Sequence, residues 1–270
     1  MIHTLINNLT IISYLLSAFL IAKNKNTPHT GLFQHLHPLT LGWIAVLLHT
    51  TTVTQQLFTP EGLNLNFFTA GSLVSNILVW LFLLATLTRS PIDKLAIAIF
   101  PIAALMVGLQ SHIEIKPQIL ANHAWQMNLH ILTSIIAFSL FNIAAFQAVL
   151  LAIQDHQLHS HRPHKLVLSL PPLQTMELLL FQMIGTGMLF LSGSLLSGFF
   201  FLEDLFAQHL AHKTILSLLA WIVFGILLSG RIRYGWRGKK AIRGTIIGFI
   251  FLTLAYFGSK LALELILQRV

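Results

Sequence analysis

Long runs of apolar residues, separated by short polar segments, dominate the chain. Eight such runs cover roughly residues 5–22, 38–58, 67–88, 93–110, 126–153, 176–201, 213–231 and 242–265. An α-helix needs about 20 mostly apolar residues to cross the hydrocarbon core of a bilayer. The longest hydrophilic stretch runs only from about Asp155 to Gln174. The pattern therefore predicts an all-α fold: a polytopic bundle of about eight transmembrane helices in a single transmembrane domain over residues 1–270.

Composition supports a membrane protein and excludes several kinds of chemistry. The 270 residues are 55% hydrophobic and only 9% charged, whereas soluble domains carry about 25% charged residues. Too few charges remain to cover a water-exposed surface, so most of the surface should face lipid. The sequence has no cysteine, which excludes disulfides, thiolate metal sites, thioether attachment of a cofactor and cysteine nucleophiles.

The connections between the apolar runs are alternately rich and poor in basic residues. The rich connections follow the first, third, fifth and seventh runs, and they contain Lys23 and Lys25, Arg89 and Lys94, Arg162 and Lys165, and six residues from Arg231 to Arg243. The other connections carry at most Lys116 or Lys213. The positive-inside rule assigns the rich connections to the cytoplasm. Both termini are then predicted to lie outside, and the first run, which lacks signal-peptide features, is predicted to be a helix of the bundle.

Small residues concentrate in the run at 176–201. Gly193 and Ser197, and likewise Ser194 and Gly198, are four residues apart. Such pairs lie on one helix face and let a second helix approach closely. We therefore expect Gly193 and Ser197 to pack against another helix.

Two histidines lie inside predicted membrane helices. His49 is near the middle of its run, where helical spacing places Thr52 and Gln56 on the same face. His130 is near the outer end of the run at 126–153, with Ser134 one turn on. An ionisable residue in a bilayer is costly and is a functional candidate by default. The alternative is a neutral imidazole that forms a hydrogen bond between helices, and the pattern alone leaves both interpretations open.

Further histidines gather in the predicted outer connections: His112, His123, His209 and His212. Imidazole is a suitable ligand for iron, copper and zinc. These loops contain few carboxylates and no closely spaced ligand set, so we do not expect a zinc hydrolase. The simpler interpretation is that these are surface histidines at the level of the lipid headgroups.

The connection from Arg231 to Arg243 carries six basic residues. One interpretation is that it binds anionic groups, such as the headgroups of anionic lipids. The simpler interpretation, which we favour, is that these charges only determine the orientation of the bundle.

Several short motifs resemble one family of membrane proteins. The segment Met127 to Ser134, with its histidine, resembles a helix start in the cytochrome c assembly family, whose members carry, present or sense haem. The region from Leu191 to Ala262 is more similar still, most clearly in Gly-Trp-Arg-Gly-Lys-Lys at 235–240. Together with Gly-Ser-Leu-Val-Ser at 71–75, the chain resembles the short YpjD-like inner-membrane branch. The resemblance implies a multi-pass protein of the bacterial inner membrane.

The same resemblance implies a site and a cofactor. His130 would be an axial ligand of haem b, held transiently, with His49, His209 or His212 as the second ligand, or with no second ligand. The phenylalanines at 199, 200, 201 and 206 would cover the porphyrin. Haem, the bilayer and other membrane proteins are the implied partners, with no nucleic acid, and the implied role is haem handling in cytochrome c biogenesis rather than enzymatic catalysis.

The sequence also departs from the family pattern. The haem-handling members have a tryptophan-rich outer loop, but the corresponding stretch from Phe199 to Thr214 contains no tryptophan. Ser229 stands about where the full assembly proteins have a histidine. A regulatory or scaffold protein that has lost haem binding, for example one acting on an ion transporter, is therefore the alternative. Secondary transport has less support, because no carboxylate or basic residue is clearly placed at mid-membrane.

Overall fold

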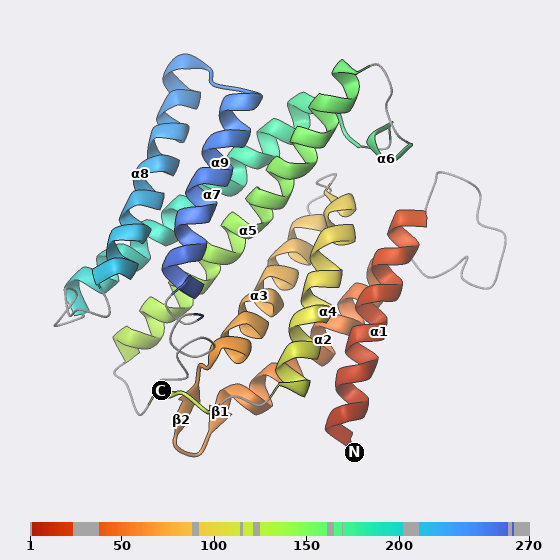
Figure 1. The fold of residues 1–270 in the computed structure, drawn as a ribbon, viewed down its shortest axis with the longest axis vertical. Coiled ribbons are helices and arrows are strands. Elements are labelled where there is room, and N and C mark those ends of the chain that lie inside the picture. The colour runs from red at the N-terminus through yellow and green to blue at the C-terminus, as the bar shows by residue number, and fades with distance from the viewer. Residues whose placement is uncertain are drawn as a thin grey trace. The chain divides into compact units, whose positions relative to one another are not determined.

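The computed structural model describes residues 2–23, 38–87, 92–113, 116–120, 125–160, 165–168, 170–201, 211–258 and 261. Its long helices are α1 (Ile2–Lys23), α2 (Pro38–Leu57), α3 (Phe67–Leu87), α4 (Ala96–His112), α5 (Trp125–His159), α7 (Leu173–Phe201), α8 (Ala211–Tyr234) and α9 (Lys239–Thr253) (Figure 1). The short helix α6 (Lys165–Leu168), the 3-10 turn η1 (Asp93–Leu95) and the π-helical turn η2 (Leu254–Gly258) complete the helical elements. Each predicted apolar run contains one long helix, which confirms the all-α prediction.

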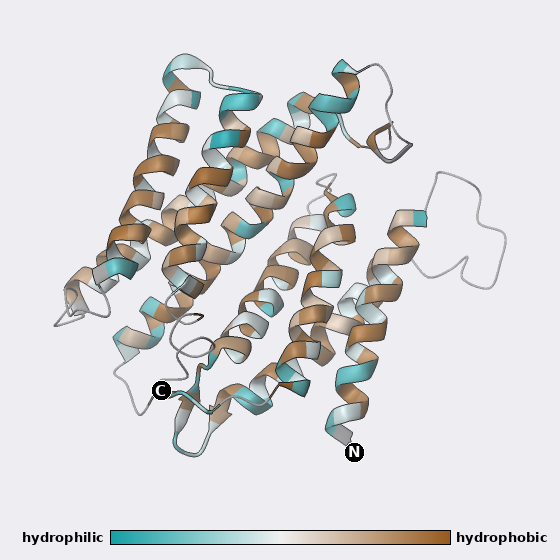
Figure 2. Ribbon diagram, viewed as in Figure 1, coloured by the Kyte–Doolittle hydropathy of each residue, from teal (hydrophilic) through white to brown (hydrophobic). Residues whose placement is uncertain are grey.

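Seven of the described helical segments are long and apolar enough to cross a membrane. Hydrophobic residues cover most of each helix, and hydrophilic residues gather mainly toward helix ends (Figure 2). The exception among the long helices is α2, which has 20 residues but carries the polar sequence His-Thr-Thr-Thr-Val-Thr-Gln-Gln in its second half. These spans confirm a multi-pass membrane protein, whereas the orientation of the bundle stays a prediction.

The chain divides into two compact units, Met1–Ala121 and Asn122–Val270. In the first unit, α1 packs against α2 and α4, and α3 packs against the same two helices. The aromatic rings of Tyr14, Phe82 and Phe100 are fully buried at its centre, with ring centroids 5.5 and 5.7 Å from Phe100. The prediction of a single transmembrane domain stays a prediction.

A small antiparallel sheet closes one end of the first unit. Strands β1 (Phe58–Thr59), β2 (Gly62–Asn64) and β3 (Ile119–Leu120) lie in the order β1-β2-β3. Phe58 pairs with Leu63, which in turn pairs with Leu120. The sheet therefore joins the connection between α2 and α3 to the segment that follows α4.

In the second unit, α5 and α7 pack along each other, and α9 packs against both α5 and α8. The rings of Phe141 and Phe224 stack with centroids 3.9 Å apart, and those of Phe138 and Tyr256 stack at 4.7 Å. Gly187 faces the Phe141 ring, where an added Cβ would lie 3.0 Å from the ring. Small residues on α7 and large aromatic residues on its partners therefore form the core of this unit.

The predicted small-residue contact on α7 is correct for one face and wrong for Gly193. Ser194 and Ser197 are buried, 4% and 9% exposed, and Ser194 bonds to Ser134 of α5. A Cβ added at Gly193 would meet no atom of the described residues within 4 Å. Successive helical residues are rotated by about 100°, so Ser194 faces α5 while Gly193, one position earlier, does not.

Within each unit, the basic connections lie at one end of the helices. Lys94 donates a hydrogen bond to the carbonyl oxygen of Ile21 at 3.4 Å, which places the start of α4 beside the end of α1. Arg237 bonds to Glu177, which places the α8–α9 turn beside the start of α7. This arrangement is the one that the alternating charges require of a membrane bundle.

Candidate functional site

His49 lies at the centre of the first unit and uses both nitrogens of its imidazole. The side chain is fully buried on α2. Its Nδ1 shares a hydrogen bond of 3.1 Å with the Tyr14 hydroxyl on α1, and its Nε2 shares one of 2.9 Å with Ser72 Oγ on α3. His49 therefore links three helices. This is the structural interpretation, a hydrogen bond between helices, that the sequence left open.

A second polar cluster begins at Thr50, the residue after His49, and joins α2 to α3. The indole of Trp80 and the amide of Asn76 both donate to Thr50 Oγ1, at 3.0 and 3.2 Å. Thr52, also buried, donates to the carbonyl oxygen of His49 at 2.8 Å. Polar groups inside an apolar environment are stable when they satisfy one another. Ligation of iron by His49 would therefore require one of its two interhelical hydrogen bonds to break.

His130 lies in the second turn of α5 and has a different environment. Its Nδ1 is 2.9 Å from the carbonyl oxygen of Ser194 and 3.1 Å from Ser197 Oγ, both on α7. A carbonyl oxygen can only accept a hydrogen bond, so Nδ1 is the protonated nitrogen of the ring. Among the described residues, Nε2 has no hydrogen-bond partner. The half-buried imidazole thus keeps one lone pair available.

The small residues of α7 make this geometry possible. Ser197 Oγ donates to the Ser194 carbonyl at 2.9 Å, and Ser134 of α5 bonds to Ser194 Oγ. Without large side chains between them, α5 and α7 approach closely enough for a backbone carbonyl to reach the imidazole. The sequence pattern predicts only a packing role for Ser194 and Ser197. Their position on the face opposite a membrane histidine was the signal that could have linked them to the site.

Of the other residues predicted to bind or cover haem, some are exposed and some lie outside the described residues. His212 is exposed in the first turn of α8, in the same unit as His130. His209, His123 and Phe206 lie outside the described residues, and so does the side chain of Phe201. Phe199 and Phe200, at the end of α7, are 69% and 71% exposed. In the part of the chain that the structure describes, no three His, Asp or Glu side chains gather as a metal-ion site.

His130 has a hydrogen-bonding arrangement that histidines which bind metals share. Histidines that bind a metal commonly donate their other N–H to a backbone carbonyl, which selects the tautomer and orients the ring. The bond from Nδ1 to the Ser194 carbonyl is of this kind. One accessible imidazole suits a haem iron, whose other in-plane ligands come from the porphyrin.

The described helices that are long and apolar enough to cross a bilayer define the class: a helical, multi-pass membrane protein. Residues 37–267 match the family model described as "Cytochrome C assembly protein". Since this match covers most of the 270 residues, the chain belongs to the cytochrome c assembly protein family, and the resemblance found in the sequence is confirmed.

Three relatives illustrate the range of the similarity. The chain is 29% identical over 235 residues to the inner membrane protein YpjD of Escherichia coli (strain K12), which covers 83% of this chain and 85% of the relative. It is 33% identical over 143 residues to an uncharacterized 28.8 kDa protein of Azospirillum brasilense, covering 52% and 53% of the two chains. It is 25% identical over 165 residues to the cytochrome c biogenesis protein CcsA of Chlamydomonas reinhardtii, covering 60% and 44%. No solved structure shows significant similarity to the chain.

Proposed function

We propose that this protein binds haem b transiently at His130, in the inner membrane, and presents it to a partner in cytochrome c biogenesis. The observation that carries the proposal is the hydrogen bond from His130 Nδ1 to the Ser194 carbonyl. It leaves the Nε2 lone pair for the iron and holds the ring between two helices. The family membership and the similarity to proteins named for the inner membrane and for cytochrome c biogenesis support this role.

His130 would hold the iron, and other residues of the same unit would complete the site. His212, exposed at the start of α8, is an accessible candidate for the second axial ligand, and His209 is the other candidate in that connection. Phe199 and Phe200 present exposed rings at the end of α7 that can cover an apolar porphyrin face. Haem is here a cargo, and the chain acts as a carrier that makes and breaks no covalent bonds.

Weak binding is expected, because the tryptophan-rich loop of the family is replaced. The stretch from Phe199 to Thr214 contains no tryptophan and one lysine, Lys213. Phenyl rings thus replace the larger indoles at the porphyrin, and few cations are available for its propionates. A carrier must release its cargo, so a low affinity is compatible with presentation of haem to a partner.

The visible spectrum of the purified protein tests this function. The wild-type chain, purified in mild detergent from haem-replete cells, should show a sub-stoichiometric Soret band that His130→Ala abolishes. His112→Ala is the matched control and should leave the band unchanged, because His112 lies at the end of α4 in the other unit and is not one of the proposed ligands. Size-exclusion chromatography of both variants controls for folding.

The visible spectrum also identifies the second axial ligand of the iron. If two imidazoles bind the iron, the reduced protein should show split visible bands, and His209→Ala or His212→Ala should remove the splitting. His49→Ala should retain the Soret band in its folded fraction. Absence of a Soret band in wild-type protein, even after incubation with excess haem, would refute haem binding, and a regulatory or scaffold role without haem would then remain.

A further inference from the structure

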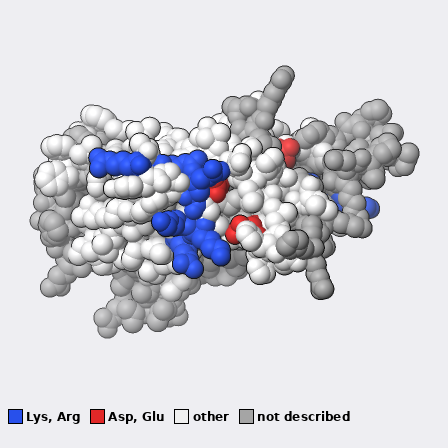
Figure 3. All heavy atoms as spheres, turned by 90° about the horizontal axis from the view of Figure 1, so that it is seen from above, with Lys and Arg blue, Asp and Glu red and all other residues white. Residues whose placement is uncertain are grey.

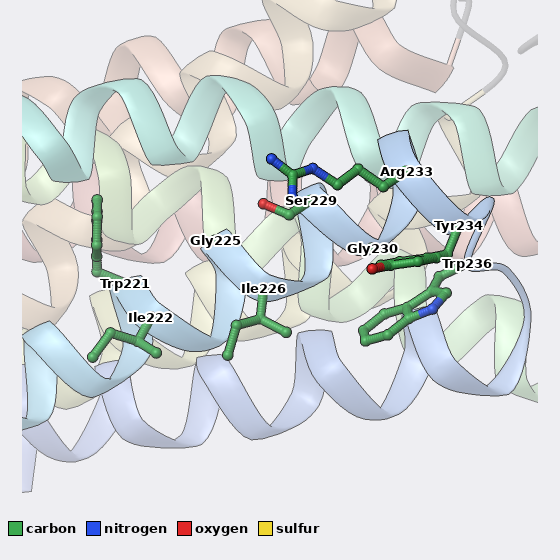
Figure 4. Close-up of a pocket in the computed structure, with 9 residues that line it drawn as sticks. All are labelled: Trp221, Ile222, Gly225, Ile226, Ser229, Gly230, Arg233, Tyr234 and Trp236. Atoms are coloured by element: carbon green, nitrogen blue, oxygen red, sulfur yellow. The ribbon is translucent and has the colours of Figure 1, made fainter.

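A groove of about 410 Å³ follows α8 toward the turn that precedes α9 (Figure 4). Trp221 and Ile222 line one end, and Tyr234 and Trp236 line the other. Its walls between these aromatic ends are mostly apolar, with Gly225 and Ile226 among the lining residues. An elongated apolar groove of this kind can hold a hydrocarbon chain.

One cation of the basic turn belongs to the groove and is not neutralised. Arg237 pairs with the Glu177 carboxylate at 2.8 Å, and Arg231 donates to the Trp236 carbonyl and lies over the Phe181 ring. Arg233 also lines the groove, and it has no ion pair or hydrogen bond among the described residues. Figure 4 shows its side chain running back along α8 toward Ser229 rather than away from the bundle.

Lysine and arginine side chains gather over this end of the second unit (Figure 3). The basic residues there are Arg231, Arg233, Arg237, Lys239, Lys240 and Arg243. The groove is thus apolar along most of its length and positively charged at one end. An anionic amphiphile has the complementary arrangement of an apolar chain and a negative group.

The turn at the cationic end is held in a defined shape. Gly235 and Gly238 have φ angles of +63° and +53°, which favour glycine. Glu177, only 6% exposed, accepts a hydrogen bond of 2.7 Å from the Gly238 N–H. The Trp236 ring lies directly against Gly230, where a Cβ would clash with it. The motif at 235–240 therefore positions an aromatic wall beside Arg233.

The length of the groove agrees with the depth of one lipid leaflet. Trp221 and Arg233 are 12 residues apart on α8, about 18 Å along a helix, and the Arg233 side chain turns back toward Ser229, which lies eight residues, or about 12 Å, from Trp221. Half of the hydrocarbon core of a bilayer is roughly 15 Å thick. An acyl chain beside Trp221 can thus belong to a lipid whose headgroup lies at Arg233.

We propose that this groove binds an anionic phospholipid of the leaflet that faces the α8–α9 turn. One acyl chain lies along Ile222 and Ile226, and the phosphate is bound by Arg233. The guanidinium group suits this role because it can donate two parallel hydrogen bonds to a phosphate. Haem does not fit the same lining, since none of its residues is a histidine and Ser229 occupies the centre.

Binding of phosphatidylglycerol and phosphatidylcholine to the full chain, measured by native mass spectrometry in mild detergent, tests the proposal. Wild-type protein should prefer phosphatidylglycerol by about five-fold or more, the effect expected of one cation at an anionic headgroup. Arg233→Gln should abolish this preference. Ser229→Leu should weaken binding of both lipids, because the added side chain occupies the path of the acyl chain.

Lys239→Gln is the matched control, because it removes the same charge from an exposed residue outside the groove lining. It should leave the preference unchanged. Equal losses in Arg233→Gln and Lys239→Gln would overturn the proposal in favour of general charge attraction. Competition by soluble glycerol phosphate as strong as that by the lipid would overturn the acyl-chain part.

The lipid site is independent of the proposed haem site, and one variant separates them. His130→Ala should keep the lipid preference even though it loses the Soret band. Loss of the Soret band in Ser229→Leu, with lipid binding retained, would instead assign the groove to haem and overturn the proposal.

Discussion

His49 and His130 look alike in the sequence, since each is an imidazole within a long apolar segment, but the two units hold them differently. In the first unit, three helices surround His49, and both of its ring nitrogens are hydrogen-bonded. In the second unit, the side-chain hydrogen bonds that His130 makes with described residues all run from Nδ1 to α7, and the ring remains half-buried. The two histidines therefore differ in whether the described residues leave a ring nitrogen available to a ligand.

The two imidazole rings differ in how many polar groups surround them and from which sides. Unit one supplies Tyr14 and Ser72 from opposite sides of the ring, and both can either donate or accept a hydrogen bond. Unit two supplies the Ser194 carbonyl and the Ser197 hydroxyl from one side only. His49 thus contributes to the stability of its unit, whereas His130 combines a weaker structural role with an Nε2 lone pair that no described residue engages.

The largest expected effect is on stability at His49. His49→Ala should lower the free energy of unfolding by about 3 kcal/mol, because it creates a cavity and leaves Tyr14 and Ser72 without their partner. His130→Ala should lower it by less than about 1 kcal/mol, since it removes only one-sided contacts of a half-buried ring. Denaturation of the two variants in mixed micelles measures both values, and equal losses would break the comparison.

The next effect concerns the contact between α5 and α7. Gly187→Leu should destabilise the protein by about 2 kcal/mol, because the new side chain collides with the Phe141 ring. Gly193→Leu should change stability by less than about 0.5 kcal/mol, since its Cβ meets no described atom within 4 Å. The same denaturation assay compares them. A large loss in Gly193→Leu would restore the original prediction that Gly193 packs against a helix.

A smaller effect is expected for a single hydroxyl in the first unit. Tyr14→Phe keeps the buried ring but removes the hydrogen bond to His49 Nδ1, and it should cost about 1 kcal/mol. A double-mutant cycle with Ser72→Ala measures whether the two bonds to His49 are coupled through the ring. If the two losses add without any coupling, His49 does not act as a link between α1 and α3.

The smallest effect is expected at the second acceptor of His130. Ser197→Ala should lower stability by less than about 0.5 kcal/mol and leave the Soret band unchanged, because the Ser194 carbonyl still accepts from Nδ1. Absorbance and denaturation of the same sample measure both results. If Ser197→Ala removes the Soret band, the hydroxyl rather than the carbonyl orients the imidazole.

The order of the elements could be predicted because each depends on a local pattern. An apolar run in lipid must satisfy its backbone polar groups internally, so it forms a helix. This rule predicted the long helices, and the motif order predicted the family. The polar face of α2 was also predicted, because Thr52 lies one helical turn from His49 and both prove to be buried.

The sequence by itself determined the class of the fold, the helices and the family, since these follow from runs and motifs within short stretches of chain. Only the tertiary structure decided the roles of the histidines and glycines. The partners of His49 are 35 and 23 residues away, and those of His130 are 64 and 67 residues away. A rotation of about 100° separates Ser194, which reaches the site, from Gly193, which does not. Such contacts depend on how helices turn toward each other, and no local pattern specifies that rotation.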